Sequence, residues 1–192
     1  MFNIFFKYFF LALFFVVFCF MGVTFSFNFS EIPSINPDFN FSSSVFAWPT
    51  PGYTRITSYF GYRNTPTAGA GKFHSGIDIG ASSGAEVIAT FSGTVTYVGF
   101  LGANGFSIQI SNGEYLSTYS HLSPHFLVYK GQYVNQGDII GTVGPKNVYG
   151  VPNNPYKDSN GNPTNGATTG PHLHFSIKID GKAVNPLNYF NI

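Results

Sequence analysis

The chain has 192 residues, enough for one domain with a substantial hydrophobic core and short additional segments. Charged residues make up 9% of the chain, well below the roughly 25% of an average soluble protein, and the formal net charge is +1 with no run of basic residues. Because nucleic-acid binding needs a cluster of cations to neutralise phosphates, this composition excludes nucleic acid as a partner.

The first expected element is an apolar segment, since residues 8–25 carry no charge and follow Lys7. Small residues at Thr24 and Ser26 suit the −3 and −1 positions of a cleavage site, which favours a secretory signal peptide over residues 1–26. An uncleaved membrane anchor is the alternative, because a bilayer takes ~20 apolar residues to cross. Both interpretations predict export to the periplasm or to the extracellular cell wall. The second adds attachment to the inner membrane through residues 8–25.

The only cysteine, Cys19, lies within that apolar segment. The exported part is therefore expected to have no disulfide, no thiol nucleophile and no cysteine-based zinc site. Residues 27–47 mix serine, asparagine and proline with isolated aromatic residues and show neither helical nor alternating periodicity, so we interpret them as a linker. The folded domain is expected over residues 48–192.

After the linker, short β-branched or aromatic runs alternate with glycines, which predicts an all-β domain. Strands are expected over residues 93–100 and 106–110. Asn112-Gly113 follows them and is a strong hairpin signal, because both central residues of such a turn must accept a positive φ.

The returning strand of this hairpin is expected over residues 115–122. Since side chains alternate along a strand, His121 would lie on the same face as Tyr119. A polar loop with four prolines then covers residues 145–168. Loops of this length are uncommon in compact domains and are usually functional or disordered.

Two histidines one residue apart begin the last expected strand, with the sequence HLHFSIKI. Alternation places His172 and His174 on one face, with Ser176 and Lys178, and an apolar set on the other: Leu173, Phe175, Ile177 and Ile179. The Cα atoms of the two histidines would be roughly 6.6 Å apart at ~3.3 Å per residue. Both imidazoles could therefore reach one small site.

His74 and Asp78 form a second polar pair, in the sequence FHSGIDIG. On a straight strand they would lie ~13 Å apart, too far to share a metal whose ligand bonds are ~2 Å. We therefore expect the chain to bend at Ser75-Gly76, where glycine accepts unusual backbone angles. Two imidazoles and one carboxylate are the protein ligands typical of a catalytic zinc site, which keeps a fourth position for water.

Hydrolysis at such a site also needs a base and a donor for the developing oxyanion or the leaving amine. The candidates are His121, His125 and one of the pair His172 and His174. His125 follows a proline in a turn and is interpreted as incidental, and a merely solvated strand face remains the alternative for the pair. A serine triad lacks its GxSxG elbow, and a paired-carboxylate glycosidase is unsupported because the acids fall mostly in turns.

Three motifs in order, GKFHSGIDIG, YLSTYSHLS and GPHLHF, resemble the M23 family of zinc metallopeptidases, of the lysostaphin and LytM type. The similarity covers roughly residues 48–190 and includes RITSYFGYR before these motifs and NPLNYF after them. It implies an antiparallel, sandwich-like β-domain with a substrate groove, and cleavage of peptide cross-links in bacterial peptidoglycan. It also implies zinc (Zn²⁺) bound by His74, Asp78 and His174, with His121 and His172 as the catalytic histidines.

Two departures from the family pattern concern substrate preference: Ser176 stands where relatives often have glutamate, and the 145–168 loop is longer than in compact members. The competing function is a non-hydrolytic module that binds the wall or regulates amidases, as some M23-like proteins that have lost ligands do. Because all five positions are filled here, we favour an enzyme. We expect a monomer that acts on peptidoglycan stems or cross-bridges, with the particular cross-link and the cell of origin of the wall left open.

Overall fold

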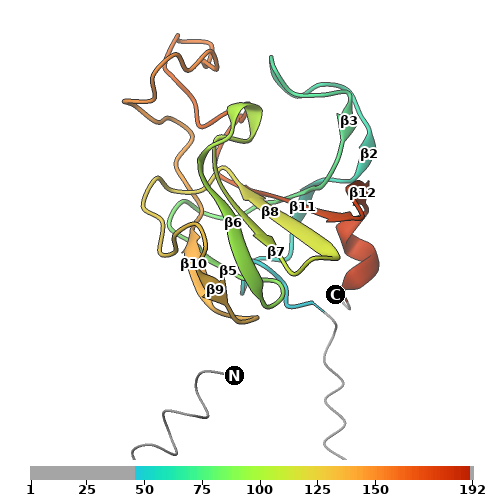
Figure 1. Ribbon diagram of the computed structural model, residues 1–192. Coiled ribbons are helices and arrows are strands. Elements are labelled where there is room, and N and C mark those ends of the chain that lie inside the picture. The colour runs from blue at the N-terminus through green and yellow to red at the C-terminus, as the bar shows by residue number, and fades with distance from the viewer. Residues whose placement is uncertain (1–45, 191–192) are drawn as a thin grey trace, which may run out of the picture. The chain divides into compact units, whose positions relative to one another are not determined.

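The computed structural model describes residues 46–190. The predicted signal or anchor segment, 1–26, and all but the end of the predicted linker lie outside the described residues. Within 46–190 the chain forms twelve β-strands and two short 3₁₀ helices and no α-helix (Figure 1). No helix in this range has the length and apolar character needed to cross a bilayer.

The elements in chain order are β1 (Ile56–Ser58), β2 (Gly61–Tyr62), β3 (Phe73–His74), β4 (Ile77–Ile79), β5 (Glu86–Ile88), β6 (Gly93–Phe100), η2 (Gly102–Asn104), β7 (Phe106–Ser111), β8 (Tyr115–Ser120), β9 (Tyr133–Val134), β10 (Ile139–Thr142), β11 (Leu173–Ile179), β12 (Lys182–Val184) and η3 (Pro186–Tyr189).

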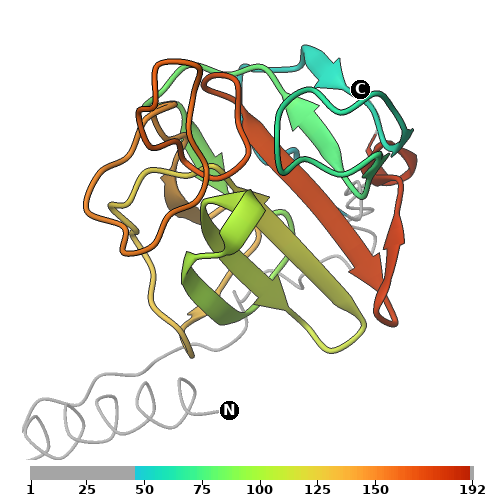
Figure 2. The same cartoon turned by 90° about the horizontal axis from the view of Figure 1, so that it is seen from above.

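One antiparallel sheet of eight strands forms the centre of the domain, in the order β1-β4-β11-β8-β7-β6-β9, with β12 paired to β11. Strands β10 and β5 form a separate two-stranded sheet, and β2 and β3 form another. Figure 2 shows the long strand β11 lying beside β8. The expectation of an all-β, antiparallel domain is therefore confirmed.

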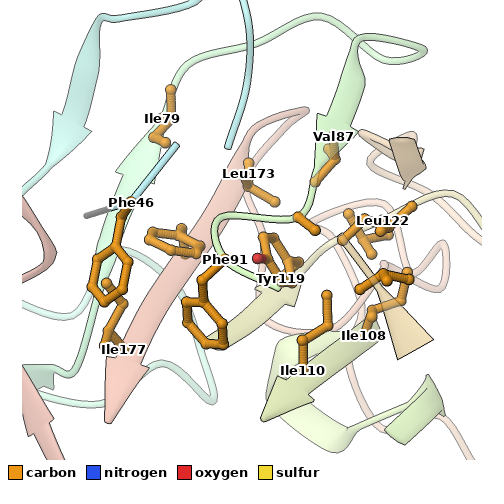
Figure 3. Close-up of a cluster of buried hydrophobic side chains, with 14 of the residues drawn as sticks. Phe46, Ile79, Val87, Phe91, Ile108, Ile110, Tyr119, Leu122, Leu173 and Ile177 are labelled. Atoms are coloured by element: carbon orange, nitrogen blue, oxygen red, sulfur yellow. The ribbon is translucent and has the colours of Figure 1, made fainter. Parts of the chain in front are cut away.

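The core lies on one face of β11 and on the strands beside it, and its residues follow the alternation of the sequence. Leu173, Phe175 and Ile177 are fully buried, as the pattern of the last strand predicts (Figure 3). Val87 on β5 and Ile140 on β10 are buried in the same cluster, so the small β5–β10 sheet covers part of the main one.

Phe46 lies within the predicted linker, yet its side chain is 2% exposed and belongs to the core. Its ring packs edge-on against Tyr115 at 5.1 Å between centroids and lies 5.3 Å from Phe91. The packed part of the chain therefore begins no later than Phe46. An isolated aromatic residue in a polar segment can still anchor that segment to the core.

The hairpin between β7 and β8 turns at Asn112-Gly113, as predicted, but only Gly113 has a positive φ, at 101°, so the expectation of a positive φ at both residues is wrong. The returning strand is shorter than expected, because β8 ends at Ser120 and His121 has φ 60°. This left-handed residue breaks the alternation. Tyr119 points into the core and is fully buried, whereas His121 contacts the other face, so the expectation that they share a face is wrong.

The 145–168 loop is folded on itself by side-chain contacts. The Asp158 carboxylate accepts hydrogen bonds from the backbone N–H groups of Asn160 and Asn162, at 3.0 and 2.9 Å, and lies 3.4 Å from the Lys146 ammonium. Burial raises the pKa of Asp158, but the hydrogen bond from Asn147 and those from the backbone outweigh burial and lower it to about 2. The loop therefore has an ionised carboxylate at its centre.

Candidate metal centre and active site

The bend expected between His74 and Asp78 is present, because β3 ends at His74 and β4 begins at Ile77. It brings His74 Nε2 to 3.1 Å from Asp78 Oδ1. The reason for Gly76 differs from the expected one, since its φ is not positive. A Cβ there would overlap the Phe175 carbonyl oxygen and lie 2.9 Å from Ser176 Cβ, so the glycine permits β3–β4 to approach β11 closely.

Strand β11 supplies the third member of the cluster. His174 is the direct cross-strand partner of Asp78 in the antiparallel pairing of β11 with β4. Its Nδ1 lies 2.9 Å from Asp78 Oδ1 and 2.9 Å from His74 Nε2. His74 of β3, Asp78 of β4 and His174 of β11 are thus brought together although His174 lies almost a hundred residues further along the chain, and each is at most 9% exposed.

The protons on these imidazoles follow from their partners. His74 Nδ1–H donates to the Tyr59 carbonyl oxygen at 2.8 Å, which leaves Nε2 as a lone pair toward the cluster. A cation between His74, Asp78 and His174 would therefore meet two imidazole nitrogens and a carboxylate oxygen.

The separations of these three atoms also suit a metal ion. They lie 2.9–3.1 Å apart. Tetrahedral zinc with bonds of ~2.0 Å has ligand atoms about 3.3 Å apart, so a small outward movement would suffice. The residues present therefore fit a metal ion of the zinc type.

Arg63 holds the other oxygen of the carboxylate and was not identified as a site residue from the sequence. Its Nη1 donates to Asp78 Oδ2 at 3.0 Å and to the Ser58 hydroxyl, so Oδ1 is left for the cluster. Burial raises the pKa of Asp78, but hydrogen bonds from His174 and His74 outweigh it and hold the pKa well below its usual range. Asp78 is therefore an anion at any physiological pH.

His121 lies beside the cluster, on the side of the 145–168 loop. Its Nδ1–H donates to the Asn165 carbonyl oxygen at 2.7 Å, and its ring centroid lies 4.7 Å from that of His172. Burial lowers the pKa of His121 to about 3, with a contribution from the neighbouring His172 and His174. The imidazole is neutral, and the Asn165 contact leaves Nε2 free to accept a proton.

His172 has the same arrangement at the edge of the cluster. Its Nδ1–H donates to the Gly170 carbonyl oxygen at 2.9 Å, with the Thr168 hydroxyl 3.4 Å away. Its Nε2 lies 3.6 Å from Asp78 Oδ1, whereas Nδ1 of His174 lies 2.9 Å from the same oxygen. The two histidines of HLH therefore differ: one presents Nδ1 to the centre of the cluster, and the other presents Nε2 at its rim.

The remaining sequence candidate, His125, is exposed and is not part of the cluster. Ser176 is 8% exposed and pairs with Thr118 of β8. Its side chain packs against Gly76 and is not part of the His-Asp-His group. A polar cavity of about 320 Å³ opens beside Asp78, His121 and His172. Its walls come from β1, from the segment 63–67 and from the end of the long loop at 167–169.

The fold and the cluster define a class of protein: an antiparallel β-domain with a His-Asp-His group that can bind a metal ion beside a polar cavity. Residues 72–186 match the sequence model of Peptidase family M23. This chain belongs to that family, and the resemblance seen in its three motifs is confirmed.

Two curated relatives are peptidoglycan-related proteins. DD-carboxypeptidase/endopeptidase Mpg of Neisseria meningitidis is 36% identical over 137 residues, which are 71% of this chain and 27% of Mpg. The murein hydrolase activator NlpD of Escherichia coli is 35% identical over 148 residues, which are 76% of this chain and 31% of NlpD. The chain therefore spans less than a third of the length of these relatives.

Two solved structures share the fold. A zinc-containing peptidase from Vibrio cholerae superimposes with a TM-score of 0.56 and 31% identity, over 72% of this chain and 37% of that one. The catalytic domain of the antimicrobial peptidase lysostaphin from Staphylococcus simulans gives a TM-score of 0.54 and 26% identity, over 71% of this chain and 91% of that domain.

Proposed function

We propose that this protein is a zinc metalloendopeptidase that hydrolyses peptide cross-links of bacterial peptidoglycan. The observation that carries the proposal is the convergence of His74 Nε2, Asp78 Oδ1 and His174 Nδ1 within 3.1 Å of one another. Catalytic zinc sites of hydrolases take two histidines and one carboxylate from the protein. The similarity to Mpg, whose name gives it endopeptidase activity, and to a zinc-containing peptidase supports both parts of the proposal.

The bound metal would supply Lewis acidity, which activates a water molecule and polarises a peptide carbonyl. His121 is placed to act as the general base, because its Nδ1–H is held by the Asn165 carbonyl oxygen and its Nε2 lone pair is available. His172 holds its ring by Nδ1–H and can donate from a protonated Nε2 to the negative charge that develops on the carbonyl oxygen.

The cavity beside these residues is suited to hold the substrate peptide. It is lined by hydroxyl and amide side chains from β1 and from the segment 63–67, together with the Arg63 guanidinium. The walls from 167–169 belong to the loop that also fixes His121 and His172. Binding and orientation of the peptide would thus be coupled to the position of the two catalytic histidines.

The proposed location is outside the cytoplasm, since peptidoglycan is an exported polymer and residues 8–25 carry no charge. We propose that residues 1–26 direct export, either as a cleaved signal peptide or as an inner-membrane anchor. The purified protein should be incubated with isolated sacculi and the released muropeptides analysed by mass spectrometry. New amino and carboxyl termini within the peptide cross-links are expected. Unchanged muropeptides in the presence of Zn²⁺ would refute the proposal.

A second candidate function is regulation of another hydrolase, and the 35% identity to NlpD, a murein hydrolase activator, favours it. A single variant distinguishes the two functions. Activation by contact would survive His174→Ala, because it needs the surface of the domain and not its metal-binding group. We favour hydrolysis because His74, Asp78 and His174 form a group that could hold a metal ion, and the rings of His121 and His172 lie beside it.

A further inference from the structure

Three aromatic side chains project into solvent next to the candidate active site, and we call them the aromatic platform: Tyr59, Tyr62 and Phe73. Tyr62 is 89% exposed, Tyr59 65% and Phe73 45%. They lie on and beside the small sheet formed by β2 and β3, which stands apart from the main sheet (Figure 1). Grouped exposed aromatic side chains mark binding surfaces more often than isolated ones do.

Two members of the platform, Phe73 and Tyr62, are held by ring contacts. Phe60, which packs against the core, meets Phe73 edge-to-face at 5.2 Å between centroids and 82° between planes. Phe73 in turn meets Tyr62 at 5.1 Å and 76°. Phe60 therefore anchors Phe73, and the high exposure of Tyr62 leaves most of its ring surface open to a ligand.

The platform is continuous with the candidate active site. Phe73 directly precedes His74, and the Tyr59 carbonyl accepts the Nδ1–H of the same histidine. Arg63 follows Tyr62 and lines the cavity. A group bound on the platform would thus lie next to a group bound in the cavity, and the two groups could belong to one substrate.

We propose that the aromatic platform binds a sugar ring of the glycan strand that carries the substrate peptide. This inference rests on the proposed function, because peptidoglycan joins each stem peptide covalently to a sugar. A pyranose ring presents an apolar C–H face, which an aromatic ring covers, and hydroxyl groups at its edge, which tyrosine hydroxyls and Lys72 can bind. Residues 56–77 contain no acidic residue that would repel the carboxylates of an attached stem.

The distances suit such a substrate. Tyr62 and Phe73 are direct cross-strand partners, and Gly61 pairs with His74. Phe73 is one residue from His74, ~3.3 Å along the strand, and cross-strand neighbours lie ~5 Å apart, so the backbone of Tyr62 and Phe73 lies within roughly 10 Å of His74. An extended stem spans ~3.3–3.6 Å per residue, so two to four residues reach from a sugar on the platform to a bond at the cluster.

The test compares two substrates that differ only in the sugar: a cross-linked peptide dimer with its disaccharides and the same dimer after their removal. The native protein should show a lower KM for the sugar-bearing dimer. Tyr62→Ala should raise that KM about 2- to 10-fold, the size of one aromatic contact, with kcat unchanged and no effect on the bare peptide. Tyr62→Trp, which retains a ring, should restore it.

Tyr129→Ala is the matched control, because Tyr129 is 70% exposed but lies outside the segments that form the site. Equal KM values for both substrates in the native protein, or an equal loss in Tyr129→Ala, would overturn the inference. A rise in KM for both substrates in Tyr62→Ala would mean that the platform binds the peptide instead.

A binding measurement separates this inference from the proposed function. Peptide-free glycan strands, prepared by removing the stems with an amidase, should bind to the native protein in a calorimetric titration and bind more weakly to Tyr62→Ala. If such binding occurs but no cross-linked substrate is cleaved, the platform stands and the peptidase proposal fails. If substrates are cleaved but the strands do not bind, the glycan platform is refuted.

Discussion

At the scale of single residues, three histidines of the site are fixed in the same way. His74, His121 and His172 each donate Nδ1–H to a backbone carbonyl oxygen, those of Tyr59, Asn165 and Gly170. Such contacts set the tautomer and leave Nε2 for chemistry. His174 differs, since its Nδ1 faces Asp78 and His74. The two histidines of HLH therefore differ: His174 turns Nδ1 toward Asp78 and His74, whereas His172 has Nε2 available.

This difference predicts opposite results for the two histidines of HLH. His174→Ala should lose bound zinc and activity together, because one of three metal-binding atoms is removed. His172→Ala should retain near-stoichiometric zinc while kcat falls by ~10²- to 10³-fold, the size expected for lost oxyanion stabilisation. Atomic absorption and kcat on a cross-linked peptide measure the two effects. Loss of metal from His172→Ala but not from His174→Ala would reverse the roles.

His121 provides a second test at this scale. His121→Ala should keep zinc and fold but lower kcat by ~10²-fold or more, the usual contribution of a general base. The matched control is His125→Ala, since His125 is exposed and outside the cluster. Steady-state turnover of both variants decides the matter: equal kcat values for His121→Ala and the native protein would make His121 a bystander.

Arg63 should act through Asp78, whose Oδ2 it holds at 3.0 Å. Arg63→Met removes this donor but keeps much of the apolar stem, so we expect zinc affinity to fall ~10- to 100-fold, as for other partners of metal-binding residues. Competition with a chromogenic chelator measures the affinity. Arg55→Met, at an exposed position beside Gly80, should leave it unchanged. An unaltered affinity in Arg63→Met would show that Asp78 needs no such partner.

At the scale of elements, the site depends on how closely the β3–β4 bend approaches β11. Gly76→Ala would press a methyl group against the Phe175 carbonyl, so we expect a loss of about 1–3 kcal/mol in the free energy of unfolding. Gly141→Ala is the control, because its added Cβ would meet only Ile108 Cδ1, at an ordinary 3.7 Å. Denaturant unfolding of both variants gives the comparison. A stable Gly76→Ala would mean that the two strands can move apart.

The elements that the sequence predicted are those set by local patterns. Alternation in HLHFSIKI and the Asn112-Gly113 turn were sufficient for β11 and for the β7–β8 hairpin. The position of His121 was not predictable in this way, because a positive φ at a histidine interrupts the alternation that the argument assumed. Its placement is set instead by the Asn165 carbonyl, 44 residues away.

The same limit applies to Arg63 and Asn165, which pattern reasoning did not assign to the site. Arg63 reaches Asp78 across 15 residues, and the Asn165 side chain joins the Phe106 N–H to the Leu122 carbonyl. Neither contact leaves a periodic signal. Only the similarity of RITSYFGYR, which precedes GKFHSGIDIG, to the family indicated that the segment ending at Arg63 matters.

At the scale of the whole molecule, one face of a β-sheet supports the candidate metal-binding group while two irregular segments complete the site around it. The main sheet fixes His174 opposite Asp78 by register. The β2–β3 region supplies Arg63 and the aromatic platform, and the 145–168 loop supplies the carbonyl that holds His121. The rigid part would thus hold the metal, and the segments at its edges would select the substrate.

The most direct test of this account is the metal dependence of hydrolysis by the purified protein. We expect about one zinc ion per chain by atomic absorption, loss of peptidoglycan cross-link cleavage when a chelator removes it, and recovery of cleavage on addition of Zn²⁺. The expectation follows from the His74, Asp78 and His174 group and from the absence of cysteine in residues 46–190. Full cleavage by a protein shown to be free of metal would contradict the account.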